Sequence, residues 1–125
     1  MREEKPRQDL RLRTKRFALR IINMCEALPD SRAGRILGDQ VFRSGTSVAA
    51  NYREAYRARS RAEFISKLGD CRKELEETIL WFELLSDSEV VKPKKLVLLL
   101  QEADELMAIF SSIIKSTRNG SSLSS

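Results

Sequence analysis

Arginines and tyrosines that lie close together supply the clearest chemistry in this sequence. Two tyrosines and four arginines fall within ten residues near the middle of the chain: Tyr52, Arg53, Tyr56, Arg57, Arg59 and Arg61. A guanidinium group can bond two phosphate oxygens at once, and a tyrosine ring can stack on an unpaired base. These residue types therefore favour a surface that binds nucleic acid. The tyrosines are equally well explained as core or interface aromatics, because tyrosine packs readily with its hydroxyl at an edge.

The residue types that most enzymes and metal sites need are missing. The chain contains no histidine, and Cys25 and Cys71 alone are too few to hold zinc. The lack of histidine weakens most acid–base and nucleophilic schemes, and no glycine-rich phosphate loop or distinct pair of carboxylates appears. We therefore expect a protein that is not an enzyme, with no catalytic residue, metal or cofactor. Both cysteines lie on apolar faces and are expected to be reduced core thiols.

Length and composition indicate a single all-α domain. The chain has 125 residues, of which 42% are apolar, and only three prolines and five glycines. No apolar run is long enough to span a membrane, and the charged N-terminus lacks the apolar stretch of a secretory signal. We expect a cytoplasmic protein without membrane contact.

Four stretches of the chain have apolar residues at helical spacing. The predicted helices cover about residues 8–28, 33–58, 61–85 and 93–118. Ser60 and Glu63 form a capping box before the third helix. Long helices with short connections predict an up-down-up-down four-helix bundle. This bundle is expected to span 8–118, between a flexible basic tail at 1–7 and a disordered serine-rich tail at 119–125.

The net charge of +5 is unevenly distributed in such a bundle. Residues 1–16, 53–67 and 115–125 meet at one end, the basic end, and carry a net charge of +9, whereas the rest of the chain carries −4. Clustered basic surfaces are typical of proteins that bind nucleic acid. The predicted binding residues are Arg11, Arg13, Lys15, Arg16, Tyr52, Arg53, Tyr56, Arg57, Arg59 and Arg61. The alternative is a solvated surface, part of which complements the dipole of the second helix.

The third and fourth helices carry more apolar residues than one buried face needs. The additional residues are Leu80, Trp81 and Leu84 in the third helix and Val97, Leu98, Leu99 and Ile113 in the fourth. Large exposed apolar patches are rare on soluble monomers, so this surplus favours a subunit interface. A generous core is the alternative interpretation.

Residues 43–55 of the second helix combine small residues with a few larger polar ones. Arg43, Ser47, Asn51 and Glu54 fall on one side at helical spacing, and Ser44 lies beside them. Such a helix lets another backbone approach closely, and its polar groups need partners when buried. We expect Asn51 to be buried and structural. Arg43 is expected to reach one or two of the acidic residues on the third helix: Glu74, Glu76, Glu77 and Glu83.

This stretch resembles the signature of the four-helix-bundle proteins encoded by intervening sequences in bacterial 23S rRNA genes. The accessory variability proteins of diversity-generating retroelements share that fold. The resemblance covers about residues 17–114, and its specific part is Arg43, Ser44, Ser47, Ala50, Asn51 and Glu54, then Phe64 and the stretch Glu74-Leu75-Glu76. It implies a closed-ring homopentamer without enzymatic activity. One departure is that Glu54-Ala55 is followed by Tyr56 and a run of arginines.

Two functions are consistent with these observations. The first is a non-enzymatic homo-oligomer, most simply a pentamer, that binds structured RNA or an RNA–DNA intermediate through its basic end. The second is a protein-interaction scaffold whose ring docks a reverse transcriptase, with nucleic acid secondary, because the retroelement relatives present a basic surface to both partners.

Overall fold

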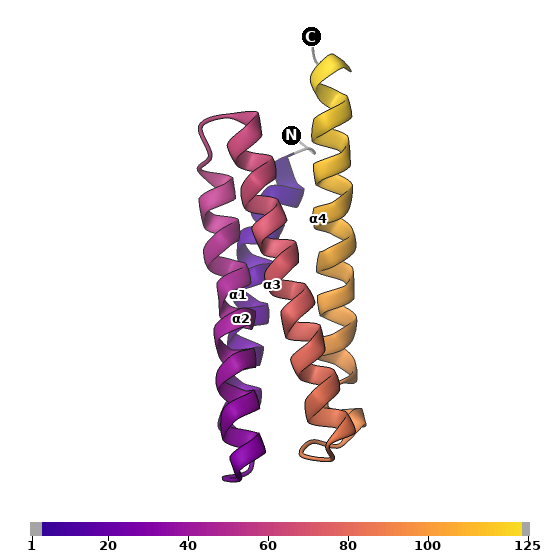
Figure 1. Cartoon of the computed structure of the whole chain (residues 1–125). Coiled ribbons are helices and arrows are strands. Elements are labelled where there is room, and N and C mark those ends of the chain that lie inside the picture. Colours follow the sequence, from indigo (N-terminus) through magenta and orange to yellow (C-terminus); the bar gives the residue numbers. More distant parts are fainter. Residues whose placement is uncertain (1–3, 124–125) are drawn as a thin grey trace.

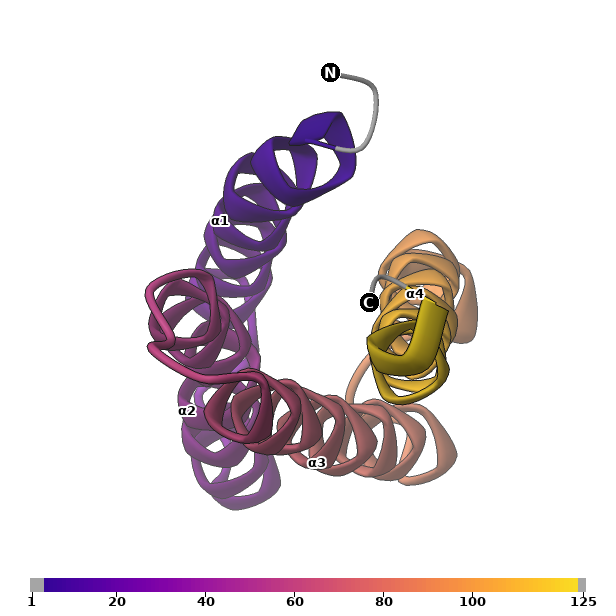
Figure 2. The same cartoon turned by 90° about the horizontal axis from the view of Figure 1, so that it is seen from above.

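The computed structural model describes residues 4–123 and consists of four long helices and one short one. In chain order these are α1 (Glu4–Glu26), α2 (Arg32–Tyr56), α3 (Arg61–Asp87), the 3-10 helix η1 (Pro93–Lys95) and α4 (Val97–Leu123). Successive long helices run in opposite directions (Figure 1). Viewed from above, they follow one another around the molecule in chain order, with α4 beside α3 (Figure 2). The prediction of an all-α protein with four helices is therefore confirmed.

The helix boundaries differ from the predicted ones at both ends of the chain. Residues 4–7, expected in a flexible tail, belong to α1. Pro6 is compatible with this because backbone N–H groups in the first helical turn have no acceptor within the helix. Residues 119–123, expected to be disordered, belong to α4, which continues through Gly120. A single glycine costs a helix only about 1 kcal/mol and need not end it. The remaining parts of the two predicted tails, residues 1–3 and 124–125, lie outside the described residues.

The connections follow the expected start signals. The Ser60 side chain accepts a hydrogen bond from the Glu63 N–H at 3.0 Å, and the Glu63 carboxylate accepts one from the Arg59 N–H at 3.1 Å. The capping box is therefore present, with its return bond displaced by one residue. Pro93 begins the 3-10 turn η1, and the regular α-helix follows only from Val97.

The inward faces of the four helices form one apolar core. Its largest aromatic side chains, all fully buried, are Phe17 from α1, Tyr52 from α2, Phe82 from α3 and Phe110 from α4. Cys71 is buried and Cys25 half-buried, both as free thiols, and burial raises their pKa values to about 12 and about 11. Both thiols are therefore protonated at neutral pH.

Small and hydroxylated residues let α2 approach its neighbours closely. A Cβ at Gly45 would lie 2.8 Å from an Ile21 side-chain carbon, so any side chain there would push against Ile21 in the α1–α2 contact. The Ser44 and Thr78 hydroxyls are 2.7 Å apart in the buried α2–α3 contact. Since Thr78 donates its single hydroxyl hydrogen to the Glu74 carbonyl, Ser44 is the donor to Thr78.

None of the described helices combines the length and the apolar character needed to cross a membrane.

Candidate nucleic-acid interface

The fold brings the predicted basic segments to one end of the molecule. The start of α1, the α2–α3 connection and the end of α4 lie together at the top of Figure 1. Three loops or termini from separate parts of the sequence thus contribute to the basic end.

A cluster of three cations around Tyr56 is the best-formed feature of the basic end. Arg11 and Lys15 lie one turn apart on α1, and Arg53 and Tyr56 lie one turn apart on α2. The Arg11 guanidinium lies 4.5 Å from the centroid of the Tyr56 ring, a cation–π contact. Together with Leu12 these residues line a surface cavity of about 330 Å³. We call Arg11, Lys15, Arg53 and Tyr56 the Tyr56 cluster.

Among the described residues, the cations of this cluster have no acidic partner. In the part of the chain that the structure describes, no ion pair joins Arg11, Lys15 or Arg53 to a carboxylate. The described carboxylates therefore do not neutralise their charge, and the cluster can attract a phosphate.

Tyr52 does not belong to this surface, and the prediction that it is available for stacking on a base is wrong. Its side chain is fully buried, whereas the Tyr56 side chain one turn later is 36% exposed. The Tyr52 ring stacks on Phe110, with 5.9 Å between the centroids. The inward face of α2 includes position 52, because it continues the buried stripe of Val48 and Ala55.

Arg13 is also not available, contrary to the prediction. Its Nε and Nη2 donate to the two carboxylate oxygens of Glu102 at 2.7 and 2.8 Å, and Nη2 also donates to Glu105 at 2.6 Å. These acceptors, above all Glu102, raise the pKa of Arg13 further above its usual range. The guanidinium thus links α1 to α4 and is neutralised by two carboxylates.

The other predicted cations remain on the surface. Arg16, Arg57, Arg59 and Arg61 are exposed, and no ion pair neutralises their side chains among the described residues. The α3 side of the basic end is less positive. There Lys67 pairs with Glu54 at 2.6 Å, and a cavity beside them includes Glu63 as well. The strongest positive charge is therefore on the side of α1 and α2.

The signature residues of α2 divide between the interior and the surface. Ser44 is buried, as described above. Arg43 lies at the surface with its Nη2 3.0 Å from Glu77 and its Nη1 3.8 Å from Glu74, so the expected pairing with α3 is present. Ser47 donates to the Arg43 carbonyl of its own helix at 2.7 Å. The polar side chains of Arg43, Ser44 and Ser47 therefore all have partners within the subunit.

The prediction that Asn51 is buried is wrong. Asn51 is half-buried, and its amide has no hydrogen-bond partner within the described part of the chain. The inward stripe of α2 passes through Val48, Tyr52 and Ala55, which leaves position 51 at the margin of the core. Glu54 is on the outer face, paired with Lys67.

The exposed apolar residues form two groups, of which only one was predicted. On α3 and α4 the exposed residues include four of the predicted ones: Leu80, Leu84, Val97 and Leu98. Leu99 is buried, and Trp81 and Ile113 are half-buried. A second exposed group on α1 and α2 was not anticipated: Leu12, Leu19, Ile36 and Phe42. These four residues lie outside the inward stripes of α1 and α2, and that position in the sequence pattern could have identified them as exposed.

Similarity to known proteins covers most of the chain. The family model described as 23S rRNA-intervening sequence protein matches residues 8–112. The chain is 36% identical to a protein of unknown function from the S23 ribosomal protein family of Bacteroides thetaiotaomicron, known from a crystal structure. The match covers 87% of this chain and 97% of that one, with a TM-score of 0.82. No curated protein matches the chain.

Proposed function

Because the chain belongs to the family of 23S rRNA-intervening sequence proteins, we propose that it is a non-enzymatic, homo-oligomeric bundle that binds RNA or an RNA–DNA intermediate through its basic end. The observation that carries this proposal is the Tyr56 cluster, in which three cations that no described carboxylate neutralises lie around an exposed ring. An aromatic ring among cations is the arrangement with which many proteins hold single-stranded nucleic acid.

The cluster suits a nucleotide with an unstacked base. Arg53 can bond two oxygens of a phosphate, and Lys15 adds a second positive charge to the same cavity. Arg11 lies over one face of the Tyr56 ring, so the exposed part of that ring is left for a base. Arg57, Arg59 and Arg61 continue the positive surface past the end of α2, where a further stretch of backbone would pass.

Two exposed apolar groups support assembly into a ring. The group on α1 and α2 and the group on α3 and α4 belong to different parts of the subunit surface. A contact between unlike surfaces, repeated around an axis, closes into a ring when the rotation allows it. We propose a pentamer, following the family resemblance.

Charge reversal on the exposed arginines tests RNA binding. The variant with Arg53→Glu, Arg57→Glu and Arg61→Glu should lose affinity for a partly single-stranded RNA by about 100-fold or more at low salt, because phosphate contacts dominate such binding. The matched control reverses three exposed arginines elsewhere, Arg20, Arg32 and Arg72, and should bind more tightly than the test variant. Circular dichroism and light scattering are used to check that both variants are folded and oligomeric before RNA binding is compared. If the folded test variant binds RNA like the wild type, the basic end is not a nucleic-acid site.

The alternative is a scaffold that docks a reverse transcriptase through the ring. It rests on the family resemblance and on the exposed apolar groups, which also suit a larger protein. The test is to purify a variant that no longer binds RNA from the native host. If a reverse transcriptase co-purifies with this variant, the scaffold function is favoured over RNA binding.

A further inference from the structure

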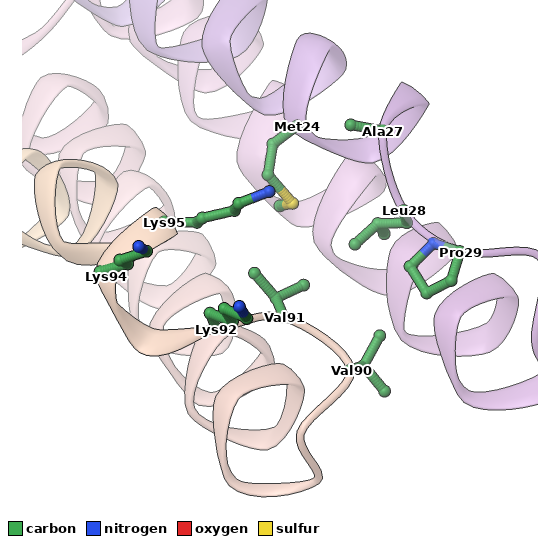
Figure 3. A pocket seen from close by; sticks show the side chains of 9 residues that line it. All are labelled: Met24, Ala27, Leu28, Pro29, Val90, Val91, Lys92, Lys94 and Lys95. Carbon is green, nitrogen blue, oxygen red and sulfur yellow. The ribbon is translucent and has the colours of Figure 1, made fainter.

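A pocket at the opposite end of the bundle combines an aliphatic interior with three lysines. It lies between the end of α1 and the connection from α3 through η1, and its volume is about 350 Å³. The lining residues are Met24, Ala27, Leu28 and Pro29 on one side, and Val90, Val91, Lys92, Lys94 and Lys95 on the other (Figure 3). We call this the lysine pocket. Neither the basic end nor the exposed apolar groups described above include any of these residues.

The walls of the lysine pocket are held in place by backbone hydrogen bonds. The N–H groups of Val90 and Val91 both donate to the Leu85 carbonyl, at 3.0 and 3.1 Å, which folds the end of α3 back on itself. Opposite them, the Leu28 N–H donates to the Cys25 carbonyl at 3.2 Å. The four larger apolar lining residues pack against the core from their buried side: Met24, Leu28, Val90 and Val91. The pocket is therefore formed before any ligand arrives.

Its three lysines lack acidic partners in the described part of the chain. Among the described residues, no carboxylate forms an ion pair with Lys92, Lys94 or Lys95. All three are exposed, and they lie within four residues around one 3-10 turn. Figure 3 shows the Lys95 side chain extending across the opening toward Met24. Like charges held this close repel one another, and a negatively charged ligand would relieve that repulsion.

The lining chemistry limits the ligand. No aromatic ring, guanidinium, hydroxyl or side-chain amide lines the pocket, so it offers nothing for a base to stack on and no planar fork for bidentate phosphate recognition. Aliphatic carbon and ammonium groups instead suit a branched aliphatic side chain with carboxylates beside it. The volume is at the low end for ligand pockets, roughly 300–1,000 Å³, and fits one or two such side chains rather than an extended hydrocarbon chain.

We propose that the lysine pocket binds an acidic segment of a partner protein, with a leucine or isoleucine of that segment inserted between Leu28 and Val91 and its carboxylates on Lys92, Lys94 and Lys95. This goes beyond RNA binding and does not depend on it. Because the pocket and the basic end lie at opposite ends of helices about 40 Å long, one subunit can hold a nucleic acid and an acidic protein segment at the same time.

Fluorescence anisotropy with a defined peptide tests the proposal. The probe is a short fluorescein-labelled peptide in which two leucines are flanked on both sides by glutamates, titrated with the full-length protein. It should bind saturably. The protein variant with Lys92→Gln, Lys94→Gln and Lys95→Gln should bind it about tenfold more weakly or worse. A matched variant that neutralises three cations away from the pocket, Arg72→Gln, Lys73→Gln and Lys115→Gln, should bind it as the wild type does.

Two control ligands separate the proposed ligand from other anions. A peptide with serines in place of the leucines should bind about tenfold more weakly, because it lacks the aliphatic anchor. Decanoate, an aliphatic carboxylate without a peptide, should not displace the probe. The proposal is wrong if the wild type does not bind the probe, if the serine peptide binds equally well, if the pocket variant binds like the matched variant, or if decanoate displaces the probe. The pocket variant should still bind RNA, so failure here is distinguishable from failure of the proposed function.

Discussion

The interior of the bundle and the surface of its basic end offer arginine and tyrosine side chains opposite environments. Tyr52 is fully buried against Phe110, and Tyr56 one turn later is exposed beneath Arg11. Arg13 is held by two carboxylates of α4, whereas Arg53 has no carboxylate partner in the described chain. Residue type therefore does not separate structural residues from the proposed binding residues in this protein, but the presence of a partner within the subunit does.

The two tyrosines should differ most in their effect on stability. Tyr52→Ala removes a fully buried aromatic side chain and should lower the free energy of unfolding by about 3–5 kcal/mol. Tyr56→Ala should cost much less, about 1 kcal/mol, because its ring is partly exposed and contacts Arg11, and it should instead weaken RNA binding. Urea unfolding at one fixed protein concentration measures the first quantity, and RNA titration the second. Equal destabilisation by both substitutions would remove the distinction drawn between the two environments.

The arginine pair should show the same contrast on a smaller scale. Arg13→Met breaks charge-assisted hydrogen bonds between α1 and α4 and should cost about 1–3 kcal/mol of stability. Its RNA affinity should stay close to that of the wild type, because the Arg13 charge is already neutralised. Arg53→Met should leave stability unchanged and lower the salt dependence of RNA binding by about one phosphate contact.

RNA binding measured across a range of salt concentrations tests the predicted difference between the two arginines. The slope of log affinity against log salt should fall for Arg53→Met and not for Arg13→Met. The reverse result would mean that RNA displaces Glu102 and Glu105 from Arg13 when it binds.

Much of the fold followed from the sequence because apolar spacing and caps are local properties. Ser60 with Glu63 marked the start of α3, and helical periodicity identified most of the inward stripes of α1, α3 and α4. The outer ends of α1 and α4 could not be predicted in this way. Pro6 lies in the first turn of α1 and Gly120 lies within α4, and neither residue ends its helix. Where a helix ends depends on small differences in free energy, and apolar periodicity does not reveal them.

The candidate binding surface was harder to predict because it depends on which side chains meet across helices. Charge counting placed Arg11 and Arg13 in one set, yet they point to different neighbours, Tyr56 for one and Glu102 for the other. No pattern within α1 distinguishes them. Asn51 was misplaced for a related reason: a one-position shift along a helix turns a side chain by 100°, enough to move it from the core to its margin.

The hydroxyl pair in the α2–α3 contact should make a moderate contribution to stability. Ser44→Ala leaves the buried Thr78 oxygen without its donor and should cost about 1 kcal/mol. Ser47→Ala, one turn later, removes only a hydrogen bond to its own helix and should cost less than about 0.5 kcal/mol. Thermal unfolding of the two variants compares them directly. A larger loss for Ser47→Ala would instead place a partner subunit against that face of α2.

The smallest expected effect concerns Glu74, whose ion pair with Arg43 is long, at 3.8 Å. Desolvation, and then repulsion from Glu77, raise the pKa of the Glu74 carboxyl despite the nearby guanidinium. A carboxyl whose pKa is higher in the folded state than in the unfolded one opposes folding while ionised, so its removal should help at neutral pH. Glu74→Gln should therefore raise the urea midpoint slightly at pH 7, whereas Glu77→Gln, which breaks the 3.0 Å pair, should lower it. The gain from Glu74→Gln should shrink as the pH falls through the raised pKa, because the folded wild type then takes up the proton first. A gain that is the same at pH 7 and at pH 4 would show that packing, and not the buried charge, distinguishes the two side chains.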